Sequence, residues 1–276
     1  MIKSLEKTDP IQIINCLHEA FSDYKIPMKM PEEYWLNRWH MAHIDYSLSY
    51  GYFEGDSLCG FVLHGIDKFR NLKSFYNMAT GVVPAHRGKK IVKQIYSDAL
   101  DKLRSAGCQM GTLEVLCDNA KAIKAYESCG FNISDKLLSF RFPTDLAFSE
   151  HSFRIEQADS CLASKYDHLK HHLLSFEHRN SIIDRRAQAF SMYELYENDI
   201  LKAYAIVKLS NKTLIQFGCL DNALDNYMPA LLYSIKQQFP DCRIMNINDK
   251  DTQLLQFLEK YDFQFFIDQY AMEVLL

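Results

Sequence analysis

A basic segment between a predicted strand and a predicted helix is the first place in the sequence where chemistry could occur. The segment runs from Thr80 to Lys93, and its cationic side chains are Arg87, Lys89, Lys90 and Lys93. The start of the helix leaves backbone N–H groups unpaired and carries partial positive charge, so it can hold a phosphate. The segment therefore predicts a pyrophosphate-binding turn. The alternative is a basic surface turn with a solvated helix start.

A second segment, from Leu113 to Phe131, could supply a proton donor. Asn119 is placed as the N-cap of a short helix. Ala122 and Tyr126 are four residues apart and share a helix face, and a small alanine beneath a tyrosine leaves room for a ligand. The phenol of Tyr126 could then protonate a leaving group. The alternative is a core tyrosine whose hydroxyl is satisfied within the protein.

Together the two segments resemble the GNAT acetyltransferase superfamily. Residues 83–91, Val-Pro-Ala-His-Arg-Gly-Lys-Lys-Ile, resemble its acetyl-CoA pyrophosphate loop. The family pattern Asn-x-x-Ala-Ile-x-x-Tyr-x-x-x-Gly-Phe is matched at every fixed position, by Asn119, Ala122, Ile123, Tyr126, Gly130 and Phe131. The resemblance covers about Ile11 to Arg141 well and the C-terminal half only in outline. It implies a twisted mixed sheet in which two central strands splay apart and admit acetyl-CoA.

The resemblance also implies roles for individual residues. Backbone amides would hold the pyrophosphate at Arg87, Gly88, Lys89, Lys90, Ile91 and Val92. The strand end at Val82 and Val83 would pair with the pantetheine arm, beside Asn119 and Ala122. An amine would attack the thioester directly, a base or a water relay would remove the amine proton, and Tyr126 would protonate the departing thiolate.

Two features depart from the family pattern. Lys90 and Val92 replace small residues of the loop, which makes close approach of a phosphate harder, although Lys90 could compensate electrostatically. The strand from Ser74 to Val82 has no carboxylate, so the usual strand-borne general base is absent. Glu114 on the next strand is the nearest candidate base, and it may equally be an exposed strand residue or a loop anchor.

Composition excludes several classes of protein. The 276 residues are 48% hydrophobic and 24% charged, with 31 Lys+Arg against 35 Asp+Glu and a net charge of −4. No nucleic-acid-binding surface is expected from such a balance. No apolar run approaches the roughly 20 residues that span a bilayer, and the first residues have no signal-peptide core. The eight cysteines form no C-x-x-C pair, which favours a reduced, cytoplasmic protein.

Two further clusters are weaker candidates for function. His168 and His172 have metal-like i,i+4 spacing, but no His-Glu-x-x-His motif accompanies them, so a solvated helix face is favoured and no metal is predicted. An aromatic cluster could wall an acceptor pocket, although its helical part is more typical of core: Tyr24, Tyr34, Trp35 and Trp39.

The order of predicted elements is the same in both halves: hairpin, strand, helix, strand, helix, strand. Turn residues 53–58 correspond to 196–201, and helix-end residues 126–131 correspond to 258–263. We infer an internal duplication. Residues 1–145 are predicted to form an acetyl-CoA-binding GNAT domain and residues 151–276 a degenerate GNAT-like domain, each an α/β unit with a twisted mixed sheet flanked by helices.

The C-terminal half has lost the motif residues. Asp251 stands where Asn119 does, Leu258 where Tyr126 does and Asp262 where Gly130 does. Asp221 and Asp225 would add negative charge near its helix start. We therefore expect this half not to hold acetyl-CoA but to close the acceptor site, extend the sheet or mediate dimerisation.

The sequence as a whole predicts an N-acetyltransferase that transfers the acetyl group of acetyl-CoA to a small-molecule or protein amine. The alternative is a non-catalytic acyl-CoA-binding or protein-interaction module with the same fold. Lys90, Val92 and the missing strand carboxylate favour the alternative, and the intact segment from Asn119 to Phe131 favours the enzyme.

Overall fold

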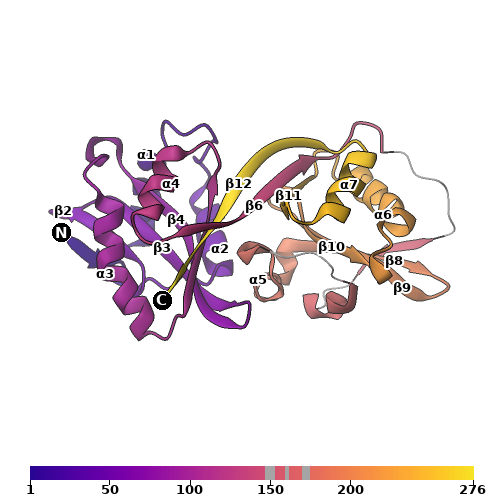
Figure 1. The fold of residues 1–276 in the computed structure, drawn as a ribbon, viewed down its shortest axis with the longest axis horizontal. Coiled ribbons are helices and arrows are strands. Elements are labelled where there is room, and N and C mark those ends of the chain that lie inside the picture. Colours follow the sequence, from indigo (N-terminus) through magenta and orange to yellow (C-terminus); the bar gives the residue numbers. More distant parts are fainter. Residues whose placement is uncertain (147–152, 159–161, 170–174) are drawn as a thin grey trace. The chain divides into compact units, whose positions relative to one another are not determined.

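A computed structural model describes residues 1–276 except 147–152, 159–161 and 170–174. The described chain divides into two compact units. The N-terminal unit comprises Met1–Ser134 together with Tyr270–Leu276, and the C-terminal unit comprises Asp135–Gln269. Both units combine a mixed sheet with helices, as the sequence predicts (Figure 1).

Helices and strands of the N-terminal unit follow the predicted order closely. They are β1 (Ile2–Ser4), α1 (Pro10–Ala20), α2 (Glu32–Met41), β2 (Tyr50–Glu54), β3 (Ser57–Phe69), β4 (Leu72–Val82), η1 (Pro84–His86), α3 (Ile91–Ser105), β5 (Met110–Leu116) and α4 (Ala120–Glu127). Helix α1 begins where the sequence indicates, because the Asp9 side chain accepts a hydrogen bond of 2.9 Å from the Ile11 N–H.

The sheet of this unit has the strand order β1-β2-β3-β4-β5-β12-β6, where β6 spans Asn132–Arg141 and β12 spans Gln264–Leu275. Strands β1 to β4 are antiparallel, and β5 runs parallel to β4. Among the described residues, the pairing of β4 with β5 ends at Asn77 and Leu113, although β4 continues to Val82. The two central strands therefore diverge, as the resemblance implied.

Packing on the two faces of this sheet follows the alternation of side chains along each strand. Helix α3 packs on the face that carries Val62 and Phe75, where its residues Ile95 and Leu103 are fully buried. Helix α1 packs against β3 and β4. Figure 1 shows α3 and α4 of this unit in the magenta part of the chain.

The C-terminal unit repeats the order of elements. They are β7 (Arg154–Gln157), η2 (Ala163–Leu169), η3 (Phe176–His178), α5 (Asn180–Asp184), η4 (Ala187–Ala189), β8 (Phe190–Glu197), β9 (Ile200–Lys208), β10 (Thr213–Cys219), η5 (Leu220–Asn222), α6 (Leu224–Gln238), β11 (Arg243–Asn248) and α7 (Thr252–Lys260). Strand order within the unit is β12-β6-β11-β10-β9-β8-β7, with β10 parallel to β11 and antiparallel to β9. The predicted duplication is confirmed at the level of fold.

The last strand of each repeat lies partly in the other unit. Strand β6 follows α4 of the N-terminal unit, yet its residues from Asp135 onward pair with β11 of the C-terminal unit. Strand β12 follows α7, yet Tyr270–Leu276 belong to the N-terminal unit, where the Leu276 N–H donates to the Gln109 carbonyl at 3.0 Å. The compact units therefore differ from the predicted ranges 1–145 and 151–276.

Two element predictions need correction. The sequence pattern of residues 164–174 favours a helix; the structure instead has a 3₁₀ helix, η2, over Ala163–Leu169, and residues 170–174 lie outside the described residues. Of the predicted solvated histidine face, His168 is exposed and His172 lies outside the described residues, whereas the nearby His178 is buried in η3, where burial lowers the pKa of its imidazole to about 4. No helix in the described parts of the chain has the length and apolar character needed to cross a membrane.

Candidate active site

A cavity of 860 Å³ opens in the N-terminal unit where β4 and β5 diverge. Nine of the predicted site residues line it: Val82, Arg87, Gly88, Lys90, Ile91, Val92, Asn119, Ala122 and Tyr126. Val83, Lys89 and Glu114 are not among its lining residues. The structure thus brings both sequence segments to one space, and it places Glu114 on β5, half-buried and away from the lining.

The turn before α3 contains two residues with a positive φ and leads into an uncapped helix. Gly88 has a φ of +77° and Lys90 has a φ of +56°. Lys90 therefore adopts the left-handed conformation that glycine adopts without strain, at a cost of about 1–2 kcal/mol for a residue with a Cβ. No side chain caps the start of α3, and its first residues, Ile91 and Val92, line the cavity. The N–H groups of the first helical turn are available to a phosphate there.

Arg87 does not direct its guanidinium freely into the cavity. Its Nη1 and Nη2 donate to the two carboxylate oxygens of Asp23 at 2.6 and 2.8 Å. Nη2 also donates to the Ala20 carbonyl at 2.8 Å, and Nε donates to the Val82 carbonyl at 3.2 Å. The hydrogen bonds from Arg87 lower the pKa of the Asp23 carboxyl to about 2. Arg87 therefore joins the end of α1 to the turn, instead of supplying the free cation that the sequence suggested.

The sequence analysis did not identify five other charged residues of the cavity wall, which come from the loops after α1 and β5 and from helix α4. They are Asp23, Lys25, Asp118, Lys121 and Lys124. Lys25 forms an ion pair with Asp118, so both lining carboxylates, Asp23 and Asp118, are paired with cations. The excess of lysines gives the cavity a positive charge that suits a phosphorylated ligand.

Tyr126 lies at the inner wall of the cavity. Its side chain is buried, and its ring packs edge-to-face on Phe131 with centroids 6.1 Å apart. Burial raises the pKa of the phenol, and hydrogen bonds with Thr80 and Asn77 oppose that rise in part. Asn77 Nδ2 in turn lies 2.8 Å from Thr80 Oγ1. The phenol thus remains protonated at neutral pH, beside two polar side chains of β4 that hold it.

Asn119 begins α4, as the sequence predicts. Its Oδ1 accepts a hydrogen bond of 3.2 Å from the Ala122 N–H. The same side chain forms a hydrogen bond with the Tyr24 phenol, whose pKa is raised chiefly by burial. Of the predicted aromatic cluster, Tyr24 lines the cavity, whereas Trp35 and Trp39 are core residues.

The helix start of the C-terminal unit that corresponds to α3 is acidic. Asp221 and Asn222 have φ values of +54° and +53° in the turn before α6. Asp225, in the first turn of α6, forms an ion pair of 2.9 Å with Lys260. Carboxylates at this helix start repel a phosphate.

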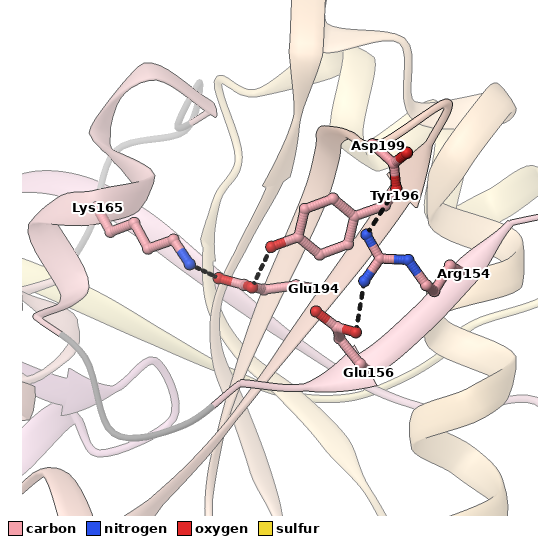
Figure 2. Close-up of polar contacts among 6 residues, drawn as sticks. All are labelled: Arg154, Glu156, Lys165, Glu194, Tyr196 and Asp199. Atoms are coloured by element: carbon pink, nitrogen blue, oxygen red, sulfur yellow. Dashed lines mark hydrogen bonds and ion pairs between the residues drawn. The ribbon is translucent and has the colours of Figure 1, made fainter.

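A buried carboxylate in the C-terminal unit is held within a satisfied network (Figure 2). Glu194 on β8 is 2% exposed and accepts hydrogen bonds from Lys165, from the Tyr166 hydroxyl at 2.7 Å and from the Tyr196 hydroxyl at 2.6 Å. Burial raises the pKa of Glu194, but these three donors outweigh burial and lower it. Because its lone pairs are occupied, we assign this cluster a structural role.

The comparisons with known proteins agree with this geometry. The sequence model of the Acetyltransferase (GNAT) family matches residues 14–131. A tandem GNAT protein from the clavulanic acid biosynthesis pathway is similar in structure, with a TM-score of 0.72 and 12% identity over 100% of this chain and 98% of that one. A GCN5-related N-acetyltransferase from Sphaerobacter thermophilus gives a TM-score of 0.71 and 9% identity over 99% and 94%.

A putative acetyltransferase from Pyrococcus horikoshii gives a TM-score of 0.69 and 11% identity over 100% of this chain and 89% of that one. No curated protein matches the sequence significantly. Residues 14–131 therefore match the Acetyltransferase (GNAT) family, and the chain as a whole has the fold of tandem GNAT proteins.

Proposed function

We propose that this protein is an N-acetyltransferase that moves the acetyl group of acetyl-CoA to an amine. One observation carries the proposal: the uncapped start of α3 and the protonated phenol of Tyr126 line the same cavity. An anion-binding helix start and a proton donor are the two elements that the reaction needs from the protein.

The proposed binding mode places the cosubstrate along the divergence of β4 and β5. Backbone amides at Arg87, Gly88, Lys89, Lys90, Ile91 and Val92 hold the pyrophosphate. Val82 and Val83 pair with the pantetheine arm, which passes Ala122 beside Asn119. The lysines at positions 90, 93, 121 and 124 of the cavity wall add favourable charge.

The proposed reaction is a direct transfer in one step. The amine nitrogen attacks the thioester carbon, the carbon–sulfur bond breaks, and the thiolate takes a proton from Tyr126. Both lining carboxylates are engaged in ion pairs, and Glu114 does not line the cavity. We therefore propose that water, and not a carboxylate, removes the amine proton.

The C-terminal unit is proposed to be a degenerate GNAT-like domain that does not hold acetyl-CoA. Its acidic helix start at Asp221 and Asp225 supports this proposal. We propose that the C-terminal unit instead closes the acceptor site or mediates homodimer formation. The free cysteines of the described residues are compatible with the proposed reducing, cytoplasmic location.

The proposal is tested by calorimetry with acetyl-CoA, followed by measurement of CoA release with a panel of small-molecule amines and of peptides with free amines. Saturable binding and amine-dependent CoA release are expected. Binding without release for any amine would instead favour a non-catalytic acyl-CoA-binding protein. Absence of binding would contradict the site assignment.

A further inference from the structure

Three side chains with metal-binding atoms converge beside the turn that precedes α3. They come from separate elements of the N-terminal unit: Glu54 ends β2, Cys59 lies in β3 and His86 ends η1. One ligand atom from each lies within 4.8 Å of the other two. We propose that these three residues bind a Zn²⁺ ion, at a site separate from the proposed chemistry of acetyl transfer.

The donor set decides which cation fits. A thiolate, an imidazole nitrogen and a carboxylate oxygen are the ligands that Zn²⁺ takes in proteins, whereas Mg²⁺ and Ca²⁺ take oxygen ligands. With metal–ligand distances of about 2.0–2.3 Å, the ligand atoms of a tetrahedral zinc site lie roughly 3–4 Å apart. His86 Nε2 already lies 3.2 Å from Glu54 Oε2. The three ligand atoms lie within 4.8 Å of one another, so they must move closer together to bind the ion, and the fourth position is left to water.

The surroundings provide both an anchor and an entry path. Cys59 is buried, and its backbone is held because its carbonyl accepts from the Val83 N–H at 3.0 Å. The side chain of Glu54 is 66% exposed and that of His86 is 14% exposed, so a cation reaches the cluster from the Glu54 side. His86 Nδ1 is buried and has no hydrogen-bond partner among the described residues, so no contact of Nδ1 opposes a rotation of the ring that directs Nε2 to the cation. Binding releases the thiol proton of Cys59 to solvent as the zinc–sulfur bond forms.

A cation bound to His86 would affect the turn before α3. His86 lines the cavity, and Arg87 and Gly88 of the anion-binding turn follow it directly. A zinc ion bound there fastens this turn to the β2–β3 hairpin. A cation that binds only the native protein also raises its melting temperature.

A simpler reading is that His86 and Glu54 form an ordinary ion pair beside an uninvolved thiol. Cobalt distinguishes the two readings, because Co²⁺ bound to a thiolate has a charge-transfer absorption band that a histidine–carboxylate pair cannot produce. The full-length protein is stripped with a chelator and titrated with Co²⁺, and Zn²⁺ binding is then measured by calorimetry.

We expect one Co²⁺ per chain with a thiolate band, displaced by one equivalent of Zn²⁺. Cys59→Ser should abolish the band, and the matched control Cys129→Ser, which alters a half-buried thiol elsewhere in the unit, should keep it. Glu54→Gln and His86→Gln should weaken Zn²⁺ binding by at least about tenfold. Because Glu54 is exposed, Glu54→Gln tests the site without disturbing the core, and circular dichroism checks the fold of each variant.

A missing thiolate band, or a band that survives in Cys59→Ser, would overturn the proposal. Unchanged Zn²⁺ affinity in both Glu54→Gln and His86→Gln would overturn it as well. These measurements need neither acetyl-CoA nor turnover, so their failure is distinguishable from failure of the proposed acetyltransferase activity.

Discussion

Arg87 donates hydrogen bonds from two guanidinium nitrogens to the carboxylate of Asp23, and this pair connects the segment after α1 with the turn before α3. Planar guanidinium and carboxylate groups joined in this way fix orientation as well as distance. Arg87, which the family pattern suggests for anion binding, therefore fixes the turn through its contacts with Asp23 and with the carbonyls of Ala20 and Val82.

Asp23→Asn should loosen this turn and weaken acetyl-CoA binding by about three- to tenfold, because the negative charge and one of the two acceptor oxygens are lost. Calorimetry measures the change. Asp101→Asn removes an exposed ion pair with Arg104 on α3 and should leave the affinity unaltered. Because the pKa of Asp23 is lowered to about 2 from 3.8, the stability that this pair contributes is present above pH 3.8 and is lost as the pH falls toward 2.

Lys90→Glu should weaken acetyl-CoA binding by at least about tenfold, because it places a carboxylate at the anion-binding helix start. The shift in melting temperature that acetyl-CoA causes should then disappear, while the unliganded protein melts as before. Lys7→Glu makes the same charge change at an exposed position outside the cavity lining. If Lys90→Glu bound acetyl-CoA like the wild type, the pyrophosphate would have to lie elsewhere.

Tyr126→Phe should lower kcat and leave acetyl-CoA affinity nearly unchanged, because the ring still packs on Phe131. Loss of a general acid costs about 10²–10⁴-fold in rate, and a thiolate leaving group places the effect near the lower end. Tyr50→Phe removes the hydroxyl of another buried tyrosine of the same core and serves as the control. Turnover equal to wild type in Tyr126→Phe would reduce Tyr126 to a packing residue.

The pH profile offers a second test of this role. The acid must be protonated, so activity that depends on it falls as the pH rises through the raised pKa of Tyr126, above the ordinary value of 10. Thr80→Val removes a hydrogen bond that lowers this pKa, and should move the alkaline limb further upward. A profile that Thr80→Val leaves unmoved would exclude Tyr126 as the titrating acid.

Met272→Ala should destabilise the N-terminal unit by about 2–5 kcal/mol, the range for truncating a fully buried methionine. Met272 is 0% exposed and packs in the core with Val115 and Phe131. Leu275→Ala, on the same strand but 77% exposed, should change stability by less than about 0.5 kcal/mol. Urea denaturation measures the stability of each variant, and acetyl-CoA binding reports on the N-terminal unit. Equal losses of stability in the two variants would show that this strand does not complete the core.

Lys165→Met should destabilise the C-terminal unit by about 1–3 kcal/mol, because it removes one charged partner of the buried Glu194. Lys212→Met removes an exposed pair with Asp241 at 3.6 Å and should cost less than about 0.5 kcal/mol. Since the pKa of Glu194 is lowered, the network stabilises the protein above the unfolded pKa of Glu194 and loses that stability on acidification. The difference between Lys165→Met and wild type should therefore shrink at low pH.

Local signals predicted most of the fold. The turn at Gly55 and the helix start at Asn119 lie where the sequence indicates, because each is set by residues within a few positions. The pairing of β6 with β11 was not predicted, and neither was the return of β12 to the N-terminal unit. Which strand pairs with which depends on partners more than a hundred residues away in the chain, and no local pattern encodes that choice.

The candidate site was likewise predicted where local motifs define it, and not where distant residues meet. The motif residues line one cavity, but the pairing of Arg87 with Asp23 joins positions that no spacing rule connects. Loop residues such as Tyr24 and Lys25 belong to the wall only because α1 ends beside the turn. Glu114 was chosen as a candidate base because it is near the motif residues in sequence, but it does not line the cavity.

The placement of Tyr270–Leu276 in the N-terminal unit bears on how the protein is made. A ribosome synthesises the whole of Asp135–Gln269 before it adds the segment that fills the gap beside β5. Until then, the N-terminal unit has an unpaired strand edge and an incomplete core. It therefore cannot complete its folding first, although domains ordinarily fold in the order in which they are synthesised. This interval is when we expect the nascent chain to depend most on a chaperone.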